Sequence, residues 1–337
     1  MNAIPRIRLT ALAAACLFFH MFALAGEGQT RPAKVLCTTF PIYQLTRNIA
    51  QGSESVTVDL MIPAAMGCPH DYALTPQDMA KIAASDILVV NGLGMEEFMG
   101  KPVERANPDI IVIDSSLGVT DVIEDEDDED DHHLEEEEEE CDPDHEYAED
   151  GHDRHGDEHD DHHHHGPNSH IFSSPALSAG MVETIAGRLC VLDPAGAAIY
   201  AANASAYAAR LRGLAGEMAD AGKGFANNRI VEPHGAFDYL ARDLKLEIVA
   251  HLQPHGQELS ASQMLELLEI IRERKPAVIV VETQYSTKAG ETIAAEAGLP
   301  AILLDSAASG PDDAPLDYYE TVMRDNLLVL KKALGWR

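Results

Sequence analysis

Residues 193–224 read DPAGAAIYAANASAYAARLRGLAGEMADAGKG, and this stretch decides how the rest of the chain is organised. Its apolar residues recur at alternating spacings of four and three, which is typical of one buried face of an α-helix. These residues are Tyr200, Ala204, Tyr207, Leu211, Leu214 and Met218. Asp193 is a suitable N-cap with Pro194 at the first helical position, and Gly222 and Gly224 are suitable stop signals. At about 1.5 Å per residue the predicted helix is about 40 Å long, enough to cross a whole domain.

Short apolar runs flank this helix, four before it and four after it. Most are rich in Val, Ile and Leu without polar alternation, as in strands that are buried on both faces of a parallel sheet. Helical patterns fill many of the gaps, and such alternation of strands and helices indicates βαβ units. The predicted strands are Lys34–Phe40, Val56–Ile62, Asp86–Asn91, Asp109–Asp114, Arg229–Glu232, Leu246–His251, Ala277–Glu282 and Ala301–Asp305.

The sequence therefore predicts an α/β protein with two four-stranded parallel-sheet lobes that are joined by one long, rigid α-helix. We place the N-terminal lobe at residues 26–192, the linking helix at 193–223 and the C-terminal lobe at 224–337. A length of 337 residues fits two domains of ordinary size. A rigid helix between the lobes would restrict hinge motion, whereas a loop linker would allow a wide closure.

The chain has 57 acidic and 24 basic residues, which gives a formal net charge of −33. This charge argues against binding to nucleic acid or to anionic lipid, since both need a basic surface. The excess is concentrated, because residues 121–161 contain 25 of the acidic residues and a single basic one, Arg154. Such a composition predicts that an insertion at residues 121–168 is disordered in the free protein.

Ten histidines lie within residues 132–165 of this insertion, which is more than solubility requires. His-rich tracts bind transition metals through neutral imidazole, so we expect auxiliary, weak metal sites here. A purely solubilising spacer is the alternative. The densest group of candidate ligands is His152, His155, His159, His162, His163, His164 and His165.

The N-terminus has the features of a secretory signal peptide, which we place at residues 1–25. Arg6 and Arg8 precede an apolar run at residues 9–24, and Ala23-Leu24-Ala25 supplies small residues at a cleavage site. The run is shorter than the ~20 residues of a membrane span, and we expect no such span further along the chain. Lipid anchoring at Cys16 is less favoured, because the apolar run continues past it. We therefore expect a periplasmic protein.

Four cysteines remain after cleavage, and an oxidising compartment permits disulfides between them. They contain no CxxC pair, which argues against a zinc knot or a thioredoxin-type redox site. Cys37 and Cys190 lie in apolar runs, where we favour buried free thiols. Any pairing with Cys68 or Cys141 is left open.

Three histidines outside the insertion occupy positions that suit a binding site. His70 follows the second predicted strand, His234 follows the first strand of the second lobe, and His170 lies where the insertion rejoins the fold. In open α/β sheets, ligands bind at the carboxyl ends of strands. Three imidazoles with the carboxylate of Asp305, at the end of the last strand, would form a near-tetrahedral site suited to Zn²⁺. The two histidines that we expect near the rim of this cleft are His251 and His255.

Six segments together carry a resemblance to a known family. They are Pro69-His70-Asp71-Tyr72 with Thr75-Pro76, Ile82–Gly92 with Glu96-Glu97-Phe98, Asn168-Ser169-His170-Ile171-Phe172 with Pro175, His234-Gly235-Ala236-Phe237-Asp238-Tyr239-Leu240, Glu282-Thr283-Gln284-Tyr285-Ser286, and Leu304-Asp305-Ser306. These segments resemble the metal-binding proteins of ABC transporters of the ZnuA/TroA-like class. The resemblance covers nearly all of residues 34–337, including the long helix and the position of the His-rich insertion.

This resemblance implies that His70, His170, His234 and Asp305 are the metal ligands. It also implies an extracytoplasmic, high-affinity Zn²⁺ receptor that delivers its metal to a membrane permease and performs no covalent chemistry. Manganese-type members usually carry a carboxylate where this chain has His234, and nitrogen ligands favour zinc over manganese. A water molecule or Glu232 is the alternative to Asp305 as fourth ligand.

Other functions make different demands on the sequence. A metal buffer or adhesin would use the insertion as its functional part, and a manganese-type receptor would share the fold. A secreted zinc hydrolase would use an activated water, but the chain has neither an HExxH nor a GxSxG motif. The partners that we expect are therefore the zinc ion and a permease of an ABC transporter, without nucleic acid, for a monomeric protein.

Overall fold

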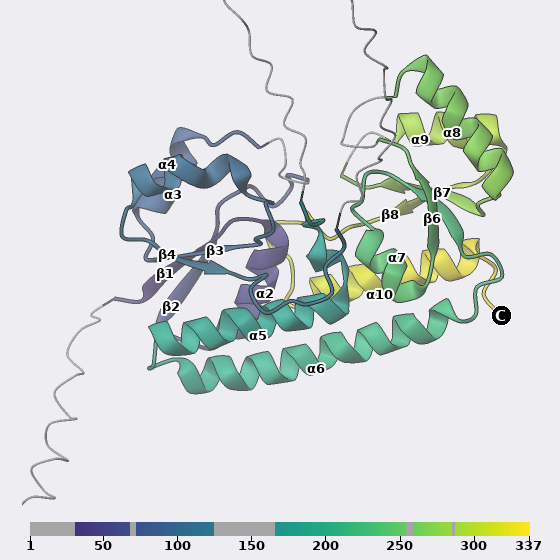
Figure 1. Ribbon diagram of the computed structural model, residues 1–337. Helices are drawn as coiled ribbons and strands as arrows, with labels where there is room; N and C mark the ends of the chain where they lie inside the picture. Colours follow the sequence, from purple (N-terminus) through teal and green to yellow (C-terminus); the bar gives the residue numbers. More distant parts are fainter. Residues whose placement is uncertain (1–30, 68–71, 125–165, 254–258, 285–286) are drawn as a thin grey trace, which may run out of the picture.

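The computed structural model describes residues 31–67, 72–124, 166–253, 259–284 and 287–337, which form two α/β lobes beside a pair of long helices (Figure 1). The first lobe comprises β1 (Ala33–Cys37), α2 (Phe40–Ala50), β2 (Val56–Leu60), α3 (Pro76–Ala83), β3 (Ile87–Val90), η2 (Glu97–Met99), α4 (Gly100–Ala106), β4 (Ile111–Asp114), η3 (Ile171–Ser173) and α5 (Pro175–Leu192). The connection is α6 (Ala197–Gly222). The second lobe comprises β5 (Arg229–Glu232), α7 (Asp238–Leu244), β6 (Glu247–His251), α8 (Ala261–Arg274), β7 (Val278–Glu282), α9 (Lys288–Ala297), β8 (Ala301–Leu304) and α10 (Tyr318–Ala333).

Both sheets have the same parallel topology. The strand order is β2-β1-β3-β4 in the first and β6-β5-β7-β8 in the second. Alternate residues of β1 face different layers, since Val35 and Cys37 belong to the core beneath α2 and α5, whereas Leu36 packs with α3 and α4. Burial on both faces explains why the strands lack polar alternation. The prediction of two four-stranded parallel sheets is confirmed, and each of the eight predicted strands is present.

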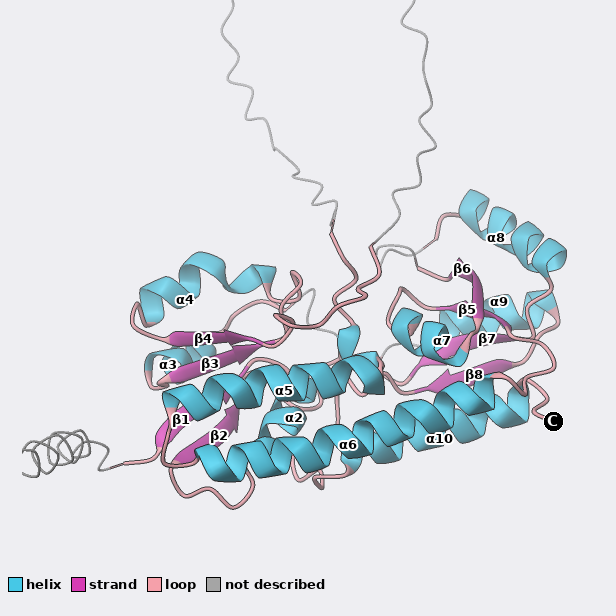
Figure 2. Cartoon of the chain, turned by 60° about the horizontal axis from the view of Figure 1, so that its bottom comes forward, coloured by secondary structure: helices cyan, strands magenta, loops and turns pink. Residues whose placement is uncertain are grey.

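The helix α6 passes beside both lobes, with α5 alongside its first half (Figures 1 and 2). It packs against α2 and α5 of the first lobe and against α7 and α10 of the second. All six residues of its predicted apolar face are buried, and they belong to one continuous core that reaches both sheets. This shared core ties the two lobes to one rigid element.

The start of α6 differs from the prediction. The helix begins at Ala197, so Asp193 is not its N-cap and Pro194 is not its first residue. Asp193 instead ends α5, and its carboxylate accepts hydrogen bonds from the hydroxyls of Tyr200, at 2.6 Å, and Ser55. The acidic side chain therefore fastens the α5–α6 turn to the first sheet.

The helix α5 contradicts the expectation that no span-like segment follows the signal sequence. Within the described ranges, α5 is the one helix that is long and apolar enough to cross a membrane by length and composition. Its start is well specified, because the Ser174 hydroxyl accepts a hydrogen bond from the Leu177 N–H and Pro175 occupies the first turn. Half of α5 is buried, and it packs along α6, as expected of a core helix.

The two ends of the acidic insertion have defined contacts, although disorder was expected from residue 121 to residue 168. Glu124 and Pro167 form an isolated antiparallel bridge, and the Asn168 N–H donates to the carbonyl of Ile123 at 2.8 Å. The Tyr239 hydroxyl of α7 donates to the Asn168 carbonyl at 2.6 Å and accepts from the Ile123 N–H at 3.0 Å. Both ends of the insertion are thus held on α7. Residues 125–165 and the predicted signal peptide lie outside the described residues.

Candidate metal-binding site

Several metal-binding side chains lie where the strands of the second sheet end. Glu232, His251 and Glu282 are the last residues of β5, β6 and β7, and Asp305 directly follows β8. Because these strands are parallel, their carboxyl ends meet at one edge of the sheet. His234 lies at the same edge, in the loop between β5 and α7. The sheet therefore gathers residues that are far apart in the sequence.

Two of the predicted ligands lie against each other. The rings of His170 and His234 meet edge to face, with centroids 5.5 Å apart and an angle of 79° between their planes. Two imidazoles that share an ion at ~2 Å would place their centroids about 5 Å apart, so this spacing suits a common ligand. Only 5% of His170 and 11% of the His234 side chain are exposed. The pair joins the segment after the insertion to the second lobe.

The surroundings of His234 keep its ring neutral. Burial lowers the pKa of His234 below its ordinary value, and only neutral imidazole binds metal. Its Nδ1 lies 3.7 Å from Oε2 of Glu282. Burial raises the pKa of Glu282 to about 7, and the charges of Glu232 and Asp305 add to this effect. Glu282 is a candidate ligand that sequence reasoning quoted only within a motif, although its place at the end of a predicted strand could have revealed it.

Asp305, the predicted carboxylate ligand, is held firmly at the edge of the sheet. Its Oδ1 accepts hydrogen bonds from Gln284 Nε2 and from the Ala307 N–H, each at 2.8 Å. The side chain of Asn326 on α10 bonds both the N–H and the carbonyl of Asp305. The carboxylate is close enough to Glu282 for its charge to act on the pKa of that residue. Asp305 therefore belongs to the same polar edge as His234.

The remaining predicted site residues lie outside the described residues. These are His70, His255 and the ten histidines of the insertion. Among the cysteines, Cys37 is a buried free thiol, as favoured from the sequence, whereas Cys190 is also free but only half-buried. Cys68 and Cys141 also lie outside the described residues.

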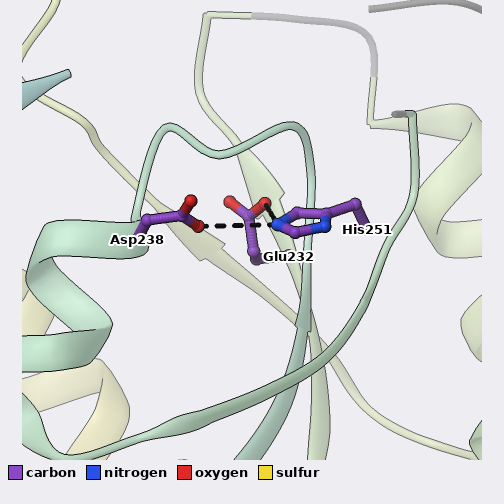
Figure 3. A group of neighbouring side chains, drawn as sticks. All are labelled: Glu232, Asp238 and His251. Atoms are coloured by element: carbon purple, nitrogen blue, oxygen red, sulfur yellow. Dashed lines mark hydrogen bonds and ion pairs between the residues drawn. The ribbon is translucent and has the colours of Figure 1, made fainter. Parts of the chain in front are cut away.

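His251 forms an ion triad with Glu232 and Asp238 (Figure 3). It was expected near the rim of the cleft, and it is the last residue of β6, as it is of the predicted strand, and is only partly exposed. Its Nε2 lies 2.9 Å from Oε1 of Glu232 and 3.5 Å from Oδ1 of Asp238. Burial opposes the charge of His251, but the hydrogen bonds and charges of these carboxylates raise its pKa to about 10. The ring is therefore protonated at neutral pH.

The buried carboxylate of this triad also shapes the loop that carries His234. Glu232 accepts hydrogen bonds from the backbone N–H groups of Gly235 and Phe237. The ligand atoms of the three triad residues all lie within 4.8 Å of one another, so the group has the geometry to hold a cation. A cation there would first have to displace the proton of His251. The triad in its protonated form is an internal ion pair that supports the neighbouring His170–His234 pair.

Comparison with known proteins shows which proteins this chain is similar to. The chain is 28% identical over 337 residues to the high-affinity zinc uptake system protein ZnuA of Bacillus subtilis (strain 168), and the match covers 95% of each protein. It is 28% identical to the zinc-binding lipoprotein AdcA of Streptococcus pneumoniae serotype 4, over 95% of this chain. That match covers 60% of AdcA, so the chain spans less than two thirds of this longer relative.

The chain also resembles a solved structure in both fold and sequence. The SBP FpvC of P. aeruginosa, in complex with Ni²⁺, superimposes with a TM-score of 0.71 at 28% sequence identity. The match covers 90% of this chain and 97% of FpvC. The family model described as ZnuA, zinc-uptake complex component A periplasmic, matches residues 35–333. With two parallel sheets, a shared long helix and a buried pair of histidines in place, the chain belongs to this ZnuA family of periplasmic zinc-uptake components.

Proposed function

We propose that this protein is an extracytoplasmic receptor that captures Zn²⁺ with high affinity and delivers it to the permease of an ABC transporter. The observation that carries the proposal is the buried contact between His170 and His234, whose ring centroids lie 5.5 Å apart. Two imidazoles in a site sheltered from water are suited to zinc. The zinc-binding relatives and the family match support the same metal.

The proposed ligand set is His70, His170, His234 and Asp305. Three nitrogen ligands and one carboxylate satisfy the tetrahedral preference of Zn²⁺ without an open position for a reacting water. Such a closed site stores an ion rather than activating a nucleophile, which is why we propose a receptor and no enzyme.

Several further parts of the proposal concern the chain outside the site. Residues 1–25 act as a cleaved export signal, and the mature protein is a periplasmic monomer. The lobes extend over residues 26–192 and 224–337 on either side of the linking helix at 193–223. The His-rich insertion collects zinc at weak auxiliary sites near the main one.

The decisive experiment measures zinc affinity by chelator competition on metal-stripped protein that lacks the insertion. Replacing His234 or His170 by Ala should weaken the tight site by about 100-fold or more, beyond the range expected for residues that only support a ligand. The matched control is His251→Ala, which removes an imidazole of the triad and should cost less affinity. Near-wild-type affinity of His234→Ala, or a larger loss in the control, would refute the proposed site.

A further inference from the structure

The buried side chain of Asn168 connects the two candidate histidine ligands. Its Nδ2 lies 2.9 Å from the carbonyl oxygen of Gly235 and 3.0 Å from Oδ2 of Asp238. A carbonyl accepts hydrogen bonds and cannot donate them, so the amide nitrogen must point toward these two oxygens. The loop and the first turn of α7 thereby fix the orientation of the Asn168 amide.

The orientation of this amide determines the protonation of His170. Oδ1 of Asn168 lies 2.9 Å from the backbone nitrogen of His170 and 3.0 Å from its ring Nδ1. An amide oxygen can only accept, so Nδ1 must carry a hydrogen and donate it. In a neutral ring this leaves the lone pair on Nε2, which is then the atom able to bind a metal.

We infer that Asn168 is a positioning residue for metal capture, which with Asp238 locks His170 in the tautomer that presents Nε2. This inference rests on the proposed function, because it takes His170 to be a zinc ligand. Histidine ligands in metal sites usually donate their second N–H to a carboxylate, a carbonyl or water, which fixes the ring. In this protein the amide oxygen of Asn168 accepts the second ring N–H of His170, and the carboxylate of Asp238 holds that amide in place.

The same amide also reaches the loop of the second histidine. Gly235 directly follows His234 and has a φ of +86°, and a Cβ at this position would lie 3.0 Å from Asn168 Nδ2. Glycine therefore allows the close approach of the loop to Asn168. One side chain thus orients His170 and contacts the backbone beside His234, so both rings are in place before the metal arrives.

The first test removes the amide. In metal-free Asn168→Ala, the ¹⁵N resonances of the His170 ring should change from those of one tautomer to a mixture. Zinc affinity should fall by about 10- to 100-fold, as found for outer-shell residues of metal sites. The matched control is Asn203→Ala, because Asn203 on α6 also donates to two backbone carbonyls, those of Ile49 and Gln51. The control should leave both the tautomer and the affinity unchanged.

The second test exchanges the amide of Asn168 and the carboxylate of Asp238. These side chains have nearly the same size, so the exchange leaves no cavity of the kind that Asn168→Ala creates. Asn168→Asp keeps an oxygen facing His170 but sets a carboxylate against Asp238, so affinity should fall by about tenfold or more. The double variant Asn168→Asp/Asp238→Asn restores a donor between the two positions and should recover most of that loss. Asp238→Asn alone supplies the reference that the comparison requires.

The outcomes separate this inference from the proposed function. A single Nδ1–H tautomer in Asn168→Ala, or a double variant no better than Asn168→Asp, would overturn the positioning role. Wild-type zinc affinity in His170→Ala would instead overturn the proposed function. Loss of affinity in His170→Ala, a mixed tautomer in Asn168→Ala and recovery in the double variant would together establish the inference.

Discussion

Glu96 is a buried carboxyl that is held at the ends of β1 and β3. It accepts hydrogen bonds from the Thr38 hydroxyl at 2.6 Å and from the N–H groups of Asn91 and Gly92. Burial raises the pKa of Glu96 to about 7 from an ordinary value of 4.5, and the charge of Asp114 adds to the shift, although the hydrogen bonds oppose it. The folded protein therefore keeps a proton that the unfolded chain releases.

This shift predicts that the contribution of Glu96 to stability is lost as pH rises from about 4.5 to about 7, because Glu96 binds more protons in the folded state than in the unfolded state there. Glu96→Gln should flatten this part of the profile, as measured by urea unfolding at a series of pH values. The matched control is Glu104→Gln, which changes an exposed carboxyl on α4. An unchanged slope in Glu96→Gln would contradict the assignment.

The histidine ligands predict a different dependence on pH for zinc binding. Protons and metal compete for imidazole, whose ordinary pKa is about 6.5. Burial lowers the pKa of His234, so this ring resists protonation longer than an exposed one. We expect affinity at the tight site to fall below about pH 6. Chelator competition between pH 5 and 7.5 would measure this, and a flat profile would argue against imidazole as the main ligand.

At the scale of the elements, α6 is the part on which both lobes depend. Leu211 is fully buried in the core that reaches both sheets, so Leu211→Ala should cost about 2–5 kcal/mol through lost contacts and a cavity. Because that core is continuous, the loss should appear in one cooperative urea transition that involves both lobes. The control Leu328→Ala changes a leucine of α10 that is 64% exposed and should cost less than about 0.5 kcal/mol. Separate transitions for the two lobes would contradict the shared core.

At the scale of the whole molecule, the His-rich insertion should be separable from the tight site. Ile123 and Asn168 lie on either side of it, bonded to each other and held by Tyr239, so two glycines can replace residues 124–166 without moving this stem. Binding at a flexible site must order the chain, which costs conformational entropy. The insertion should therefore bind zinc more weakly than a preformed site. Its dense negative charge should make that binding sensitive to salt.

Titration calorimetry of the deletion variant tests this separation. We expect the loss of at least one weak, salt-sensitive zinc site, while the affinity of the tight site changes by no more than roughly an order of magnitude. The intact protein serves as the reference at low and high salt. Loss of the tight site in the deletion variant, with no weak sites in the intact protein, would refute both the collecting role of the insertion and the separate histidine site.

The sequence by itself determined the elements of the fold. The eight apolar runs and the buried face of α6 were predictable, because burial produces a regular spacing of apolar residues along the sequence. His234 was indicated by its place after a predicted strand, since ligands bind at the carboxyl ends of parallel strands. His170 was indicated by its place where the insertion rejoins the fold. The family resemblance is confirmed by the family match, whereas the full ligand set stays a prediction.

The tertiary structure alone decided which polar groups meet. Asp193 looks like an N-cap in sequence, yet its carboxylate accepts hydrogen bonds from the hydroxyls of Tyr200 and Ser55, and the helix begins at Ala197. The sequence also did not predict the His251 triad or the contact of Asn168 with Asp238, which is 70 residues away. Hydrophobic burial is read from periodicity, but hydrogen bonds and ion pairs are short and directional. Their partners exist only once the packed lobes bring distant residues within about 3 Å of each other.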